Sequence, residues 1–179
     1  MTALLLFLLL NSIIAYRNLQ MVIAGQHAVA QTGETLLNLQ SLFSYLQDAE
    51  TGQRGFLITG DESYLEPYEL AIGQLDQSRK QLSLDAPQLS KEVAELDRAI
   101  DTKLAELKRS LDAFRANGPG GAETAADLVK QNNGKQAMDD VRDVVLTIRQ
   151  SELQHRQELS DEFDASVGYA VGSLLVSTV

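Results

Sequence analysis

The chain contains no cysteine and no tryptophan, and only three of its 179 residues are proline. Without cysteine it forms no disulfide and offers no thiolate to a metal ion or a redox reaction. Because proline breaks helices in their interior, its scarcity permits long uninterrupted helices. Positive charge is also scarce, since 25 aspartates and glutamates outnumber 15 lysines and arginines and give a net charge of −10. A basic surface that would bind nucleic acid is therefore not expected.

Signatures of catalysis and of cofactor binding are also missing from the sequence. It has no glycine-rich phosphate loop after a strand, no nucleophile elbow and no kinase signature. The two histidines, His27 and His155, lack well-placed partners for a metal site, and acidic neighbours such as Asp139-Asp140 diverge by about 100° around a helix. We expect a protein that is not an enzyme, holds no metal and carries no cofactor.

An apolar run stands at each end of the chain. Ala3–Tyr16 is shorter than the roughly 20 residues that a helix needs to cross a membrane. A signal peptide is the alternative to an anchor, but no basic residue precedes the run and the small-x-small site Ala28–Ala30 lies far beyond it. We interpret residues 1–16 as a truncated first transmembrane helix and 167–179 as the start of a truncated second one. The segment 17–166 then lies between them, on one side of the membrane.

This middle segment has helical periodicity throughout and no sustained alternation that would predict strands. Its first part carries an apolar residue every seven positions and a companion stripe three residues on, which predicts a heptad seam on a helix ending near Thr59. The main stripe is Val22, Val29, Leu36 and Phe43, and the companions are Leu39 and Leu46.

Three further helices follow. Asp61, after a glycine, is expected to cap the second helix, and Asp85–Pro87 turns the chain into the third. The third helix ends at Asn117–Gly121, and the fourth begins near Glu123 with an interruption at Asn132–Gly134. The sequence predicts an all-α fold, an up-down-up-down four-helix bundle whose long first and fourth helices continue into two membrane spans.

The predicted lengths of these helices differ. At about 1.5 Å per residue the first and fourth reach roughly 60–70 Å, while the second and third are shorter. The shorter pair should pack on the part far from the membrane and leave a two-helix stalk. Because two helices bury little apolar surface, we expect a homodimer whose stalk again contains four helices.

One polar segment departs from ordinary helix sequence. Continuing the seven-residue count from Phe43 places Glu50 on the apolar stripe, where a carboxylate is costly unless it is paired. Arg54, four residues later, is placed to pair with it. Counted from the two apolar ends, Glu50 and Gly134 stand at similar heights, so Asn132–Lys135 should lie beside this pair. The cluster is a structural interlock, a binding site or a solvated ion pair.

Two glycines and two tyrosines accompany this polar segment. Gly52 and Gly55 each weaken a helix by about 1 kcal/mol relative to alanine, so they indicate a close backbone approach by a neighbour, or flexibility. Tyr64 and Tyr68 lie one turn apart at the start of the second helix. We expect both to pack in the core with their hydroxyls at its rim, and contact with a ligand or capping protein is the alternative.

Two sequence motifs resemble the CHASE3 family of sensor domains, which lie between two membrane helices in bacterial histidine kinases, diguanylate cyclases and some chemoreceptors. They are ETGQRGFLITGDESYLEPY at Glu50–Tyr68 and GKQAMDDVR at Gly134–Arg142. The resemblance covers nearly the whole middle segment. It implies a bacterial inner-membrane protein with residues 17–166 in the periplasm or outside the cell, relaying a stimulus by helix movement to an output that is most commonly a histidine kinase.

The resemblance implies no particular ligand, whether small molecule or protein. Candidate sensing or interlock residues are those of the two motifs: Glu50, Thr51, Gly52, Gln53, Arg54, Gly55, Tyr64, Tyr68, Gly134 and Lys135. The rival function is a structural or partner-binding helical membrane ectodomain without an output module.

Overall fold

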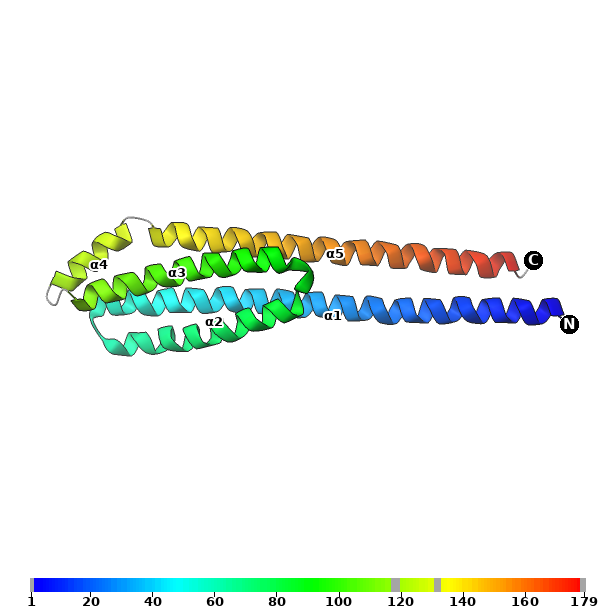
Figure 1. Ribbon diagram of the computed structural model, residues 1–179, viewed down its shortest axis with the longest axis horizontal. Coiled ribbons are helices and arrows are strands. Elements are labelled where there is room, and N and C mark those ends of the chain that lie inside the picture. Colours follow the sequence, from blue (N-terminus) through cyan, green and yellow to red (C-terminus); the bar gives the residue numbers. More distant parts are fainter. Residues whose placement is uncertain (1, 117–119, 131–132, 178–179) are drawn as a thin grey trace. The chain divides into compact units, whose positions relative to one another are not determined.

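The computed structural model describes residues 2–116, 120–130 and 133–177, and their side chains except at 2–4, 8, 122, 126, 129, 166 and 169–177. All regular structure in these ranges is helical, which confirms the predicted all-α fold (Figure 1). The four main helices are α1 (Thr2–Thr59), α2 (Leu65–Asp85), α3 (Ser90–Ala116) and a fourth formed by α4 (Gly121–Lys130) and α5 (Asn133–Ser177). Two short 3₁₀ helices, η1 (Glu62–Tyr64) and η2 (Pro87–Leu89), precede α2 and α3.

The helix ends follow the local chemistry of the sequence. Gly60 adopts a φ of 72°, a conformation that other residues rarely tolerate, and its N–H donates to the carbonyl of Phe56 at 2.7 Å. Asp61 caps η1 by accepting a hydrogen bond from the Ser63 N–H at 2.9 Å. Asp85–Pro87 turns the chain as predicted, but Pro87 stands in the first turn of η2, ahead of α3. Of the predicted breaks, Asn117–Pro119 and Asn132 lie outside the described residues.

The chain forms two compact units, and Thr35–Gln150 makes up the larger one, called here the bundle unit. Parts of α1, α2, α3 and α5 lie side by side in it (Figure 1) and share one apolar core. Arg79 of α2 joins α3 through ion pairs with Asp97 and Asp101, both at 2.7 Å. The fully or nearly fully buried core residues are Leu39, Leu42, Leu46, Leu75, Leu82, Val93, Leu96, Ile100, Met138, Val141 and Ile148.

The core stripe of α1 differs from the predicted seam. The companions Leu39 and Leu46 are buried, but Leu36 and Phe43 of the main stripe are only partly buried and pack at the edge of the core. Leu42, three residues after Leu39, occupies the core instead. The buried positions of α1 thus alternate in steps of three and four, and the predicted main stripe flanks them on one side.

The smaller unit, called here the stalk unit, consists of Met1–Glu34 and Ser151–Val179. Glu152 is only 2% exposed there, and its carboxylate accepts a hydrogen bond from the Thr32 hydroxyl at 3.0 Å. Thr32 and Glu152 therefore form a buried, hydrogen-bonded polar pair between α1 and α5.

One helix among the described residues, α1, is long and apolar enough to cross a membrane, and none of its most apolar stretch is buried. A membrane anchor and a signal sequence both fit this composition. The second apolar run is helical as far as Ser177, but its side chains from Tyr169 onward lie outside the described residues.

Candidate functional site

The last three turns of α1 contact α3 on one face and the start of α2 on another. Gln53 is 2% exposed, and its side-chain amide donates to the Ser110 hydroxyl of α3. The Arg54 guanidinium forms an ion pair with the Glu50 carboxylate at 2.9 Å, which confirms the predicted pair. The Glu50 side chain is 16% exposed and that of Arg54 is 57% exposed, so the arginine lies at the rim of the site.

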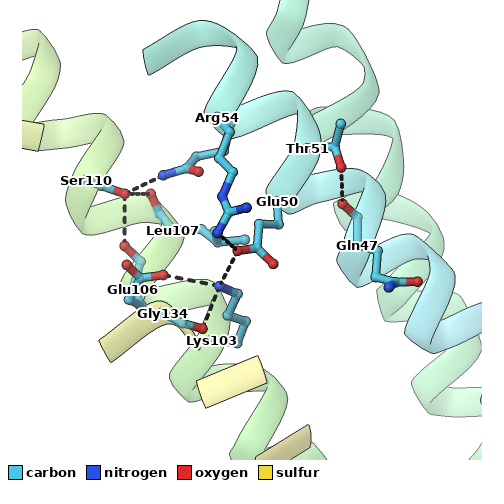
Figure 2. Close-up of polar contacts among 10 residues, drawn as sticks. Gln47, Glu50, Thr51, Arg54, Lys103, Glu106, Leu107, Ser110 and Gly134 are labelled. Carbon is cyan, nitrogen blue, oxygen red and sulfur yellow. Dashed lines mark hydrogen bonds and ion pairs between the residues drawn. The ribbon is translucent and has the colours of Figure 1, made fainter. Parts of the chain in front are cut away.

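A buried lysine forms the centre of this site (Figure 2). The side chain of Lys103 on α3 is 1% exposed, and its ammonium lies 3.3 Å from the Glu50 carboxylate and 3.4 Å from that of Glu106. It also donates to the backbone carbonyl of Gly134, at the start of α5, at 2.9 Å. Three acceptors match the three donors of an ammonium, which offsets much of the cost of burying its charge.

The start of α5 approaches this lysine at a glycine, and the Glu106 carboxylate lies close to the position that a side chain would take. A Cβ there would lie 2.7 Å from an oxygen of the Glu106 carboxylate, too close for an ordinary contact. The predicted proximity of Glu50 and Gly134 is therefore confirmed, with Lys103 between them. We call Glu50, Arg54, Lys103, Glu106 and Gly134 the charged cluster.

The charged cluster borders a cavity of about 190 Å³. The cavity is lined by the five residues of the charged cluster and by Gln53, Leu107 and Lys135. Lys135 is exposed, and its ammonium pairs with Asp139 at 2.7 Å. Hydrogen bonds from Lys135 and Arg142 lower the pKa of the Asp139 carboxyl below its ordinary value. The walls of the cavity carry both signs of charge.

The glycines of the first motif face the other neighbour, η1 and the start of α2. A Cβ on Gly52 would lie 2.8 Å from the backbone carbonyl oxygen of Tyr64 and 3.1 Å from the backbone nitrogen of Tyr68. A Cβ on Gly55 would collide with the Tyr64 ring. Close backbone approach, one of the two predicted reasons for these glycines, is therefore the one that the structure supports.

The two tyrosines differ in burial. Tyr68 is half-buried and packs against two small groups of buried apolar residues, one around Leu107 and one around Phe56. Burial raises the pKa of its phenol above the ordinary value. Tyr64 is 46% exposed and covers Gly55 with its ring, so it packs on the surface rather than in the core.

Thr51 takes no part in the charged cluster. It is exposed, and its hydroxyl donates to the carbonyl of Gln47 one turn earlier (Figure 2). His27 and His155 are likewise exposed, and no group of three or more metal-ligating side chains occurs among the described residues.

Sequence reasoning missed three members of the site: Lys103, Glu106 and Ser110. A signal for two of them was present, since counting sevens from Leu89 gives Leu96, Lys103 and Ser110. Glu106 had no comparable signal, since its position faces the start of α5 only in the folded bundle.

Replacing Arg54 with alanine should have a small effect. Because its guanidinium is mostly exposed and Lys103 still neutralises Glu50, we expect the free energy of unfolding to fall by about 1 kcal/mol or less. Urea denaturation of the whole chain measures this. A loss as large as that caused by removing Lys103 would show that the arginine, not the lysine, anchors the site.

The bundle unit is a helical bundle with an apolar core and one buried charged cluster. The CHASE3 domain model matches residues 25–162, and the chain belongs to this family of extracytoplasmic sensor domains. The crystal structure of the Rhodopseudomonas palustris histidine kinase HK9 sensor domain matches with a TM-score of 0.64 at 23% identity, over 70% of this chain and 98% of that one. At this identity the match shows a shared fold. The comparison with curated proteins gave no match.

Proposed function

We propose that this chain is the signal-input domain of a bacterial transmembrane receptor, and that this receptor is a two-component histidine kinase. In this proposal residues 1–16 and 167–179 belong to two membrane spans, and residues 17–166 lie outside the cytoplasm. A stimulus acting on the bundle unit changes the positions of α1 and α5, and the spans carry this change to a cytoplasmic output.

The observation that carries the proposal is that the charged cluster links α1, α3 and α5. α1 and α5 are the two helices that contain the apolar runs, and Lys103 of α3 bonds to both of them, at Glu50 and at Gly134. A displacement of α5 by one or two ångströms would break the 2.9 Å contact with Gly134. The contacts of the charged cluster are therefore made in one position of α5 relative to α1 and broken in another.

The test uses a chimera in which residues 1–179 are followed by the cytoplasmic half of a histidine kinase with a measurable phosphorylation output. Gly134→Ala puts a methyl group 2.7 Å from the Glu106 carboxylate, so it should move the start of α5 or the carboxylate. A bias of about 1 kcal/mol changes the ratio of two states roughly fivefold. We expect a change in basal phosphorylation of that order.

The matched control is Gly73→Ala, since a Cβ at Gly73 of α2 meets nothing within 4 Å. The output of this control should equal that of the unmodified chimera. If Gly134→Ala lowers the melting temperature but leaves phosphorylation unchanged, the proposed relay is wrong. An output that no change in the bundle unit affects would favour the structural or partner-binding ectodomain.

A further inference from the structure

A hollow lies within the bundle unit, between the last turns of α1 and the start of α2, and is called here the α1–α2 hollow. Its volume is about 470 Å³, within the roughly 300–1,000 Å³ of ordinary small-molecule sites. Its lining includes Asp48, Thr51, Gly52 and Gly55 of α1. Steps of three and four residues place these four on one face of the helix, apart from the face that carries the charged cluster.

The α1–α2 hollow exists because two of the residues on this face lack side chains. Gly52 and Gly55 leave the surface of α1 bare, and the Tyr64 ring lies over Gly55. Leu70 lines the hollow from α2 and is 64% exposed, and the partly buried Tyr45 lines it from α1. The hollow therefore offers two aromatic rings and an aliphatic side chain to the body of a small molecule.

One charged side chain, that of Asp48, stands on this lining. Asp48 is exposed, and it makes no ion pair or hydrogen bond with any residue that the structure describes. The charged cluster differs in this respect, since the Glu50 carboxylate is already paired with Arg54 and Lys103. An unpaired carboxylate beside aromatic rings is the arrangement that attracts an organic cation.

The charge of the whole chain favours the same class of ligand. Its net charge of −10 raises the local concentration of cations and disfavours anions. A bare metal ion fits poorly, because divalent cations take several oxygen ligands and the lining supplies a single carboxylate. The apolar remainder of the lining matches a cation that carries an apolar body.

We propose that the α1–α2 hollow binds a small organic cation, with its ammonium group at Asp48 and its apolar body against Tyr45, Tyr64 and Leu70. The role of this ligand as the stimulus rests on the proposed function. A molecule held between α1 and α2 would act on the same three turns of α1 that carry Glu50 to the charged cluster. Its binding does not depend on any output.

Titration calorimetry of the whole chain in a neutral detergent tests this site, with the detergent alone as the blank. Three probes share a phenyl body and differ in charge: 2-phenylethylammonium, 2-phenylethanol and 3-phenylpropionate. We expect the cation to bind about fivefold more tightly than the alcohol, because one exposed ion pair and a cation–π contact separate them. The propionate should bind most weakly.

Three variants locate the site. Asp48→Asn should lower the affinity for the cation to that for the alcohol. The matched control is Asp76→Asn, an exposed position on α2 outside the lining, which should keep the fivefold preference. Thr51→Phe puts an aromatic ring into the hollow from an exposed position and should abolish binding of all three probes. Circular dichroism of each variant should match that of the unmodified chain.

Equal affinity for the cation and the alcohol in the unmodified chain, or binding of none of the probes, would overturn the proposal. So would equal losses in Asp48→Asn and Asp76→Asn, which would indicate a general attraction to an acidic surface. Binding that persists in Thr51→Phe would place the site elsewhere. Because calorimetry needs no output module, a chimera that Gly134→Ala leaves unchanged would refute the proposed function without affecting this site.

Discussion

Replacing Lys103 with methionine should lower the free energy of unfolding by about 3–5 kcal/mol, the usual cost of removing one partner from a buried ion pair. Methionine fills similar space but carries no charge. The loss leaves the Glu106 carboxylate, whose side chain is 9% exposed, without its ammonium, and removes the donor to Gly134. Urea denaturation of the whole chain, followed by circular dichroism, measures the change.

The matched control is Lys108→Met, five residues along the same helix. The Lys108 side chain is 68% exposed and pairs with Asp112 at the surface, so its loss should cost less than about 1 kcal/mol. Adding Glu106→Gln to Lys103→Met should restore part of the stability, because it removes a carboxylate that has lost its partner. Equal effects of Lys103→Met and Lys108→Met would mean that the charged cluster contributes nothing as a buried network.

Gly52→Ala should destabilise the chain by about 1–3 kcal/mol, although alanine is the better helix former. The new methyl group would lie 2.8 Å from the carbonyl oxygen of Tyr64 and 3.1 Å from the nitrogen of Tyr68. Both are backbone atoms, so η1 and the start of α2 must move away from α1. The melting temperature of the whole chain reports the cost.

Gly73→Ala should have the opposite sign. Gly73 lies inside α2, and an added Cβ meets nothing within 4 Å, so helix propensity alone acts and should stabilise the chain by about 0.5–1 kcal/mol. A stabilising Gly52→Ala would show that the close approach of η1 to α1 is not a requirement of the fold.

Helix ends were predictable because single residues determine them. Gly60 supplies a positive φ, Asp61 accepts the capping hydrogen bond, and Pro87 fits a first turn, all within a few residues of sequence. Pairing of Glu50 with Arg54 was predictable for the same reason, since four residues bring two side chains to one helix face.

The remaining features depend on packing between distant segments. Lys103 becomes a site residue only because α1 and α5 bring two further acceptors to it, and its position in a leucine stripe gave no sign of them. The predicted orientation of the apolar seam on α1 was also wrong. In a helix of 3.6 residues per turn, stripes one position apart differ by about 100°, and the sequence of α1 offers apolar residues on both.

The most direct test of the account is the distance between α1 and α5 in the bundle unit. Spin labels at Gln47→Cys and Gln150→Cys, both exposed, report it by pulsed electron paramagnetic resonance of the whole chain. If the charged cluster sets the relative position of these helices, Lys103→Met should shift or broaden the distance by about 1–2 Å, the size of known signalling shifts, and Lys108→Met should not. An unchanged distance distribution in folded Lys103→Met would contradict the central claim that this cluster couples the two helices.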